Sequence, residues 1–375
     1  MKKVITIIIV ILIVLGIIIY LDLYQNKITF NETKVNIKKT DNNYIEVDNA
    51  KDFIKALDNK NTHIINIVKD IDLGYNKVEK NKYIEEHNIP LIHPTLKKSG
   101  ISRLLLKNKN NLIITSSNKS SIYHANIIIE NSSNIKIDNI VFKELWEWDE
   151  ETTAEYDRNE WDNITILNSN KIEISNCSFT KSYDGIIDIN NSNNIIISNN
   201  NLDIININNE FFNKQFEELE KNIDKYPMYS YLRNNVSLSI EQIKKLSQYQ
   251  FKLFLIGVEP NCPKNKNIVI HDNKFINVKT RIPQARNSSV YFYNNYIDSR
   301  NIRNDIISME QIEMINEKYP KFVSLKKHGV ISIERSYIVS KNNTFNGIDV
   351  PYTNTRDKDY FKIGIIKVIN DKIVD

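Results

Sequence analysis

The segment Asn131-Ser-Ser-Asn-Ile-Lys-Ile-Asp-Asn139 recurs as Asn168-Ser-Asn-Lys-Ile-Glu-Ile-Ser-Asn176 and again as Asn191-Ser-Asn-Asn-Ile-Ile-Ile-Ser-Asn199. Each copy alternates apolar and polar residues over four or five positions, which is the period of a β-strand. Ile172 and Ile195 are 23 residues apart. A repeat of this length, with one short strand and an asparagine turn, is typical of a solenoid in which each coil stacks its apolar side chains on the next.

Asparagine suits the turns of such a solenoid, because it tolerates the left-handed backbone conformation and can stack as a hydrogen-bonded ladder. The leucine-rich repeat has a similar period, but its Leu-x-x-Leu-x-Leu frame is missing here. We therefore predict an all-β fold, a parallel β-helix that occupies residues 44–375.

Three segments interrupt the repeat. Residues 143–159 are acidic and aromatic, and residues 207–251 read as helical. Ser239 and Gln242 form a capping box in the second segment, and Ser308 and Gln311 form another at the start of the third, residues 306–319. Insertions in a solenoid loop out on one side and often line the binding face.

Composition and charge set limits on the partners. The 375 residues carry 50 Lys+Arg against 46 Asp+Glu, and no basic block stands out. We therefore expect no nucleic-acid partner, and a monomer in which local charges meet any anionic ligand. Cys177 and Cys262 are far apart and in no metal-ligand spacing, so we expect two buried thiols.

The N-terminus predicts export. Lys2 and Lys3 precede the uncharged, apolar stretch from Val4 to Leu21, which is 18 residues long. This length lies between that of a signal peptide and that of a spanning helix. We expect residues 1–24 to be a signal-anchor or signal peptide and residues 25–43 to be a linker. The remainder would then be extracellular or at the cell surface, with a membrane contact only through the N-terminal segment.

Two arginines that bracket a proline, in Arg281-Ile-Pro-Gln-Ala-Arg286, lie between two of the strand-like repeats. This pattern resembles the active-site signature of the pectate lyases, and the resemblance extends over residues 45–375. Members of that family are right-handed parallel β-helices that cleave acidic plant polysaccharide by β-elimination. The resemblance therefore implies a right-handed helix and a lyase.

The resemblance also implies a calcium site. Glu160 and Asp162 match acidic ligands that the family places two residues apart, and Tyr183-Asp-Gly-Ile-Ile-Asp188 matches its D-G-x-x-D stretch. Asp184 and Asp188 would complete the carboxylate set for Ca²⁺, a hard cation that needs several oxygen ligands. Carboxylates on adjacent coils of a β-helix come within one strand spacing of each other, so the four could share one ion.

Four basic residues complete the site that the resemblance implies. Arg281 takes the place of the catalytic base and Arg286 that of its substrate-side partner. Lys252 falls five residues before Gly257, where the family has a lysine that contacts a substrate carboxylate. Lys326 falls where some members have a substrate-binding arginine.

We thus predict a lyase that cleaves de-esterified polygalacturonate, or a related uronate polymer, with Ca²⁺ as cofactor. Pectin lyases, which act on methylated polymer, replace the calcium acids that this chain keeps. A hydrolytic polygalacturonase needs clustered aspartates and a Gly-His-Gly, which the sequence lacks. A non-catalytic surface β-helix that binds polysaccharide stays open as an alternative.

Overall fold

The computed structural model describes residues 29–87, 90–153, 156, 158–203, 209–257, 262, 264–303, 305–320, 322–324, 326–355 and 363–374. Residues 32–375 form one compact unit. The predicted hydrophobic segment, residues 4–21, lies outside the described residues. Within the described part, no helix combines the length and the apolar character that crossing a lipid bilayer requires.

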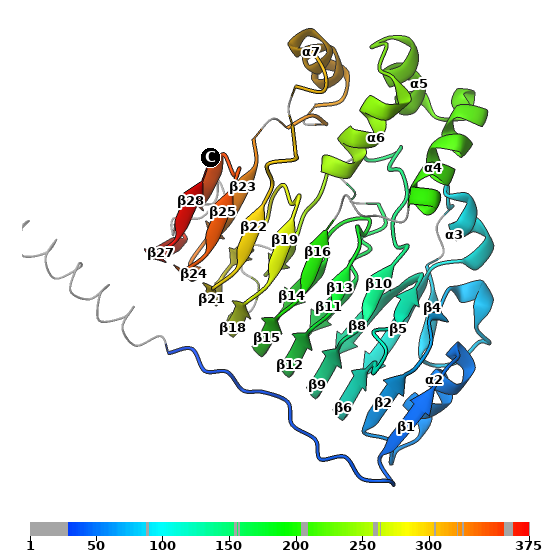
Figure 1. The fold of residues 1–375 in the computed structure, drawn as a ribbon, viewed down its shortest axis with the longest axis vertical. Helices are drawn as coiled ribbons and strands as arrows, with labels where there is room; N and C mark the ends of the chain where they lie inside the picture. Colours follow the sequence, from blue (N-terminus) through cyan, green and yellow to red (C-terminus); the bar gives the residue numbers. More distant parts are fainter. Residues whose placement is uncertain are drawn as a thin grey trace, which may run out of the picture. The chain divides into compact units, whose positions relative to one another are not determined.

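Three sheets make up the unit, and their strands pair in parallel except for β4 and β5, which are antiparallel (Figure 1). Sheet A contains β1 (Tyr44–Val47), β2 (Ile64–Ile67), β6 (Asn110–Thr115), β9 (Ser133–Asp138), β12 (Asn170–Ser175), β15 (Asn193–Ser198), β18 (Asn265–His271), β21 (Ser288–Tyr293), β24 (Tyr337–Lys341) and β27 (Ile365–Ile369). Sheet B contains β3 (Ile71–Asp72), β7 (Ser121–Tyr123), β10 (Val141–Lys143), β13 (Ser178–Phe179), β16 (Asn201–Asp203), β19 (Lys274–Ile276), β22 (Tyr296–Asp298), β25 (Thr344–Asn346) and β28 (Lys372–Val374). Sheet C contains β4 (Ile84–Glu86), β5 (Ser102–Lys107), β8 (Ala125–Glu130), β11 (Ile164–Leu167), β14 (Ile187–Asn190), β17 (Phe254–Ile256), β20 (Gln284–Arg286), β23 (His328–Ile333) and β26 (Val350–Thr355).

Each coil contributes one strand to sheet C, then one to sheet A and then one to sheet B, as β8, β9 and β10 do. The repeated isoleucines of the sequence lie directly above one another, because Ile172 pairs with Ile135 on one side and with Ile195 on the other. All three are fully buried. The predicted fold, a right-handed parallel β-helix, is confirmed.

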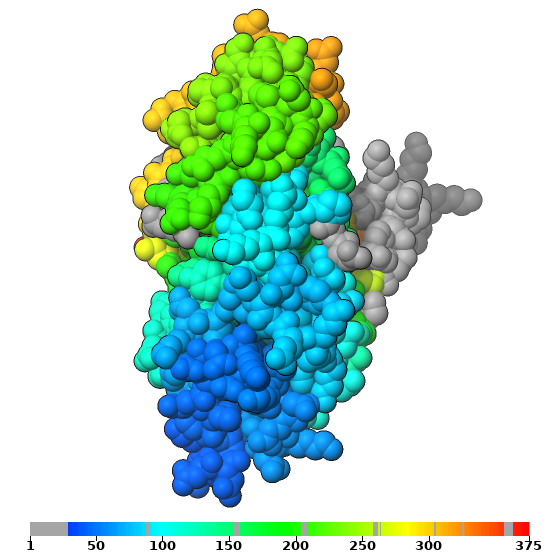
Figure 2. All heavy atoms as spheres, turned by 90° about the vertical axis from the view of Figure 1, so that its right-hand side faces the viewer, coloured from blue at the N-terminus to red at the C-terminus, as the bar shows by residue number. Residues whose placement is uncertain are grey.

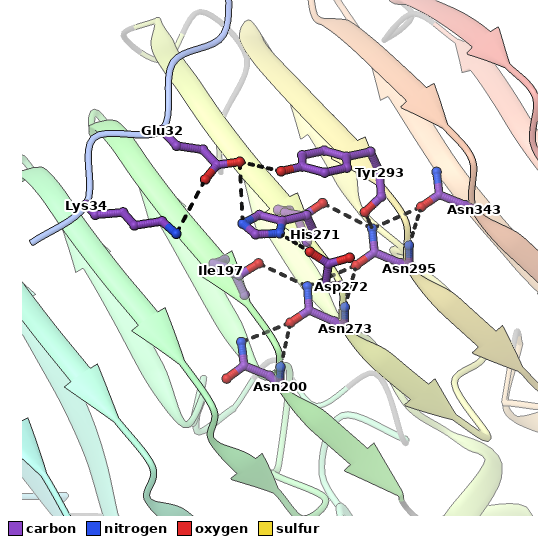
Figure 3. A network of polar contacts seen from close by, with 11 residues as sticks. Glu32, Lys34, Ile197, Asn200, His271, Asp272, Asn273, Tyr293, Asn295 and Asn343 are labelled. Carbon is purple, nitrogen blue, oxygen red and sulfur yellow. Dashed lines mark hydrogen bonds and ion pairs between the residues drawn. The ribbon is translucent and has the colours of Figure 1, made fainter.

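The asparagine turns behave as predicted. Asn176 and Asn199, between sheets A and B, both have a φ of 56°, in the left-handed region. The residues that follow such positions point inward and form a ladder (Figure 3). In it, Asn200 Nδ2 donates to Asn273 Oδ1 over 3.0 Å, and Asn273 Nδ2 donates to Asn295 Oδ1 over 2.9 Å. The ladder satisfies amides that would otherwise be buried without partners.

The turns between sheets C and A carry a second ladder, made of serines. Ser132 N donates to Ser169 Oγ, and Ser169 N donates to Ser192 Oγ. These serines were not predicted, although each follows the asparagine that begins a repeat.

The helical insertions all leave from sheet B and return to sheet C, so they gather along one side of the strands (Figure 1). The predicted capping boxes are confirmed: Ser239 caps α6 (Ile240–Tyr249) and Ser308 caps α7 (Met309–Lys318). The remaining helices are α2 (Ala50–Asp58), α3 (Pro94–Ser99), α4 (Asn209–Lys221) and α5 (Pro227–Asn234), with 3₁₀ turns η1 (Tyr75–Lys77) and η2 (Ile223–Lys225).

Aromatic side chains hold this helical layer to the β-helix. Trp146 packs on Phe212 with ring centroids 4.9 Å apart, and Trp148 meets Tyr229 at 5.7 Å. Both tryptophans are fully buried. Helix α3 lies directly against α4 (Figure 2), where Lys97 Nζ is 3.0 Å from Glu218 Oε1. Trp146 and Trp148 of the acidic and aromatic insertion therefore extend the hydrophobic core of the β-helix into the helical layer.

Residues 32–43, before β1, cross the outer face of sheet A. The N–H of Val35, whose side chain is buried, donates to Glu173 Oε2 on β12 over 2.9 Å. Glu32 binds the hydroxyl of Tyr293, and its Oε1 lies 3.8 Å from His271 Nε2 (Figure 3). These contacts explain why several outward-facing side chains of sheet A are buried.

Cys177 and Cys262 are both free and buried, as predicted. Cys177 lies in the inward ladder position that Asn200 occupies one coil later, and its N–H donates to Asn200 Oδ1.

Candidate active site

A groove of about 520 Å³ runs over the outer face of sheet C. Its floor follows from the strand period: Ile164 and Ile187 face the core, while Thr165 and Asp188, which pair across β11 and β14, face outward. The residues that line it are Glu85, Arg103, Leu105, Lys107, Asn126, Ile128, Glu130, Glu160, Asp162, Thr165, Leu167, Asp184, Asp188, Asn190, Leu255 and Arg281.

All four predicted metal-binding acids line this groove. Asp162 precedes β11 and is buried, whereas Asp184 precedes β14 and is half-buried. Glu160 is exposed and has a left-handed backbone with a φ of 49°. Two coils thus bring together two pairs of acids, the second of which follows the first by 22 or more residues in the sequence.

Gly185 lets two of the carboxylates approach its backbone. Its N–H donates to Asp162 Oδ1 over 2.9 Å. A methyl group at this position would lie 2.8 Å from Asp162 Oδ1 and 3.7 Å from Asp188 Oδ1. The glycine of the D-G-x-x-D stretch is therefore part of the site, which its position between two acids already suggested.

Burial disfavours the ionised form of these carboxylates. Burial, and after it the Asp184 carboxylate, raises the pKa of Asp188 to about 7, although Arg281 acts in the opposite direction. Burial and then Asp188 raise the pKa of Asp162 well above its usual range. Crowded carboxylates of this kind are stabilised by a cation, and hard cations prefer oxygen ligands. The donor set therefore fits Ca²⁺ in its chemistry.

In the described structure, a lysine supplies part of the positive charge that stabilises these carboxylates. Lys252 Nζ is 2.5 Å from Asp184 Oδ1. Over the residues that the structure describes, no three His, Cys, Asp or Glu side chains converge closely enough to hold a metal ion. Asp184 is turned toward Lys252, so the carboxylates share the groove without meeting at a common point.

Arg281 lies at the same edge of sheet C, just before β20. It has a left-handed backbone with a φ of 59°, and its carbonyl accepts the N–H of Phe254 on β17 over 2.9 Å. The peptide bond from Ile282 to Pro283 is cis. The side chain is half-buried and reaches the groove, where its charge acts on Asp162 and Asp188.

The other predicted substrate-binding residues lie apart from this groove. Lys252 and Lys326 line a smaller pocket of about 130 Å³, which shares Asp184 with the groove. Arg286 ends β20 and lines neither cavity of the described structure.

Several residues of the site were not predicted. Asn126 lines the groove, and its Nδ2 donates to the carbonyl of Asp162 over 2.6 Å. Lys279 and His328 line the smaller pocket. Lys279 is two residues before Arg281, and that proximity was the one signal in the sequence.

No protein-family model matches the chain. The chain is 33% identical over 326 residues to Pectate lyase B of Paenibacillus amylolyticus, an alignment that covers 84% of this chain and 83% of that protein. This chain belongs to the pectate lyase family.

Solved pectate lyases agree with this assignment. The pectate lyase PelN from Paenibacillus sp. 0602 superposes with a TM-score of 0.82 at 30% identity, over 92% of this chain and 81% of that one. A more distant pectate lyase, from Bacillus subtilis, gives a TM-score of 0.54 at 16% identity over 92% of this chain and 84% of that one, and shows the shared fold alone. The prediction that the chain is a pectate lyase is thereby confirmed, while the roles of individual residues stay predictions.

Proposed function

We propose that this pectate lyase cleaves de-esterified polygalacturonate, or a related uronate polymer, by Ca²⁺-assisted β-elimination with Arg281 as the base. The observation that carries the proposal is the meeting of Asp162, Asp184, Asp188 and Arg281 in one groove on sheet C. A groove lined by several acids, a cationic side chain and groups with perturbed pKa values is where a reaction is expected.

The substrate class follows from the charges. A uronate polymer carries a carboxylate on each sugar, and the acids of the groove can bind it only through cations between the two. Asp162, Asp184 and Asp188 would hold Ca²⁺, which when bound supplies a Lewis acid for the substrate carboxylate. Lys252, next to Asp184, would offer a second positive contact.

The reaction removes the proton on C5, which lies next to the carboxylate. Arg281 in its neutral form takes this proton, the electron pair of the C5–H bond forms the C4–C5 double bond, and the C4–O bond breaks. The leaving oxygen gains its proton from water. Because an arginine side chain is almost always protonated in proteins, this role favours alkaline pH.

Two further observations support the proposed substrate. Pectate lyase B and PelN are pectate lyases by name. A pectate lyase of Bacillus sp. N165 was solved in complex with trigalacturonate; it resembles this chain in fold, with a TM-score of 0.52 at 14% identity over 90% of this chain and 84% of that one. We also propose that the enzyme acts outside the membrane, either secreted or anchored by residues 4–21.

The test is to incubate the purified protein with polygalacturonate, with added Ca²⁺ or with a chelator. Elimination creates a double bond conjugated with the carboxylate, which absorbs in the ultraviolet, whereas hydrolysis creates only a reducing end. We expect the absorbing product only when Ca²⁺ is present, and we expect it to form faster at alkaline pH. Reducing ends without absorbance would indicate a hydrolase, and neither signal on several uronate polymers would favour a non-catalytic binding protein.

A further inference from the structure

We propose that Lys181 is a positioning residue of the active site, which holds the backbone beside Lys252 so that the ammonium group of Lys252 reaches Asp184 at the edge of the groove. This inference rests on the proposed function and extends it. Lys181 belongs to the turn between β13 and β14, which also carries Asp184. It lines neither the groove nor the smaller pocket of the described structure, so it can act on a substrate only through other residues.

The turn of Lys181 binds the segment before β17 at two points. The ammonium group of Lys181 donates to the carbonyl oxygen of Gln250, the C-cap residue of α6. Two residues farther along the same segment, the ammonium group of Lys252 pairs with the Asp184 carboxylate. The first contact therefore fixes the backbone from which the side chain of the second contact extends.

This segment also joins the coil of the acids to the coil of the proposed base. The carbonyl of Leu253 accepts the N–H of Ile186 over 2.9 Å, and the N–H of Leu253 donates to the carbonyl of Thr280 over 3.2 Å. Residues 250–253 thus lie between the two turns that supply the reactive groups. A displacement at the start of the segment would move Lys252 relative to both turns.

Lys181 is a cation in an apolar environment. It is only 2% exposed. Its Nζ lies 5.0 Å from the ring centroid of Phe251, 5.3 Å from that of Tyr156 and 6.0 Å from that of Trp146. Aromatic faces attract a cation, and the Gln250 carbonyl is its one hydrogen-bond acceptor among the described residues. Because an apolar side chain would fill this space without the cost of burying a charge, the ammonium group points to a role beyond packing.

The charge of Lys181 also acts on the pair formed by Lys252 and Asp184. Burial, and after it the charge of Lys252, lowers the pKa of Lys181 well below its usual range, whereas Asp184 acts in the opposite direction. Lys279 contributes a third ammonium charge to this cluster. A change at Lys181 should therefore be felt at the Asp184 carboxylate, which is one of the proposed calcium ligands.

These contacts predict opposite effects on the substrate and on the ion. Without the bond from Lys181 to Gln250, Lys252 is no longer held in place and its contact with the substrate weakens. Asp184 is then more available to Ca²⁺, and one positive charge that repels the ion is gone. A purely structural role of Lys181 would instead weaken substrate and calcium binding together, because disorder of the turn would displace both groups.

The experiment compares the full-length protein with Lys181→Met, which keeps the approximate length of the side chain and removes the charge and the hydrogen bond. Calcium affinity, measured by calorimetry without substrate, should rise roughly threefold or more. The value of kcat/KM for polygalacturonate at saturating Ca²⁺ should fall roughly tenfold, the equivalent of one hydrogen bond from a charged group. Lys274→Met, at an exposed lysine on β19, is the matched control and should behave as wild type.

A double-mutant cycle identifies the residue through which Lys181 acts. In a Lys252→Met background, Lys181→Met should lower kcat/KM by less than about twofold, because the group that it positions is already absent. A full tenfold loss in that background would overturn the inference. If Lys181→Met does not fold, Lys181→Gln takes its place, since it removes the same charge and leaves a polar group near the carbonyl; calcium affinity should again rise.

The two proposals can fail separately. A wild-type protein that forms no product, while Lys181→Met binds calcium more tightly, would reject the lyase and support the link between Lys181 and Asp184. In an active enzyme, unchanged kcat/KM in Lys181→Met would overturn the positioning role and leave the lyase intact. Calcium affinity that stays the same or falls in the folded variant overturns the positioning role in either case.

Discussion

Lys252 Nζ lies 2.5 Å from Asp184 Oδ1, so one member of the acidic cluster is paired with a basic residue. The charge of the lysine also stabilises the ionised form of Asp188. If Ca²⁺ binds among the same carboxylates, Asp184 must turn from the ammonium group toward the ion. Calcium and Lys252 would therefore compete for the Asp184 carboxylate.

The first prediction concerns the cation. Asp184→Asn keeps the size of the side chain and removes one of the carboxylate charges on which calcium affinity depends. Calcium affinity by calorimetry should fall roughly tenfold or more. Asp305→Asn, an exposed aspartate paired with Arg303, is the matched control and should bind as wild type. Equal affinities for all three proteins would contradict the proposed site.

Gly185→Ala should weaken the calcium site much more than it destabilises the fold. The added methyl group would meet Asp162 Oδ1 at 2.8 Å, so the carboxylate must move and its bond to the Gly185 N–H must weaken. Because the clashing atom is the end of a side chain, the free energy of unfolding should fall by only about 1 kcal/mol. Calcium affinity should fall more than tenfold. A variant with unchanged affinity would show that Asp162 does not bind the ion.

The base can be tested by charge-conserving changes. Arg281→Lys should abolish formation of the absorbing product while the thermal midpoint stays close to wild type, because lysine keeps the charge but not the position of the guanidinium group. Arg286→Lys should reduce the rate much less, since Arg286 does not line the described groove. Comparable losses in both variants would argue against Arg281 as the base.

Most of the fold could be predicted because its signals are local. The copies around Ile172 and Ile195 specify strand, turn and stacking at once, and the capping box at Ser239 marks where a helix begins. The groove acids were found through motifs with fixed spacing, such as the stretch from Asp184 to Asp188.

The remaining features depend on contacts between coils, and the spacing of residues in the sequence does not predict those contacts. Lys279 and His328 meet because a backbone hydrogen bond joins residues 49 positions apart. Val35 belongs to a segment read as linker, yet it packs beside Glu173, and nothing in its neighbours signals that contact. The packing of Trp146 on Phe212 joins two insertions in the same way.

Glu147 should make stability depend on pH. Burial raises the pKa of this carboxyl group from 4.5 to about 7, despite N–H donors from Ile92 and His93. The folded state keeps the proton in a range where the unfolded state has lost it. Stability therefore falls as pH rises from about 4.5 to about 7, by about 3 kcal/mol in total.

Glu147→Gln should remove this fall, because the amide stays neutral and still accepts the two N–H groups. Asn159 Nδ2 donates to Glu147 Oε1 in the wild type, so the Asn159 amide must rotate for its unpartnered Oδ1 to accept the new N–H₂. Denaturant unfolding at several pH values, with the exposed Glu241→Gln as control, measures the effect. Parallel pH profiles for wild type and Glu147→Gln would refute it.

The last prediction concerns the asparagine ladder. Asn295 Oδ1 accepts the backbone N–H and the Nδ2 of Asn273, and its Nδ2 donates to the carbonyl of Ile270 and to Asn343 Oδ1. Asn295→Ala removes these four hydrogen bonds and takes from the buried N–H of Asn273 its acceptor, although Asn273 Nδ2 still donates to the carbonyl of Ile197 and Asn343 Oδ1 still accepts the backbone N–H of residue 295. An unsatisfied buried N–H costs about 1–3 kcal/mol and each other lost hydrogen bond about 0.5–1.5 kcal/mol, so the free energy of unfolding should fall by about 3 kcal/mol. The exposed Asn301→Ala should change it by less than about 0.5 kcal/mol. The denaturation midpoints of the two variants provide the comparison. A small loss in Asn295→Ala would mean that the coils are held by their isoleucines alone, and that asparagine is used at these positions only for the shape of the turn.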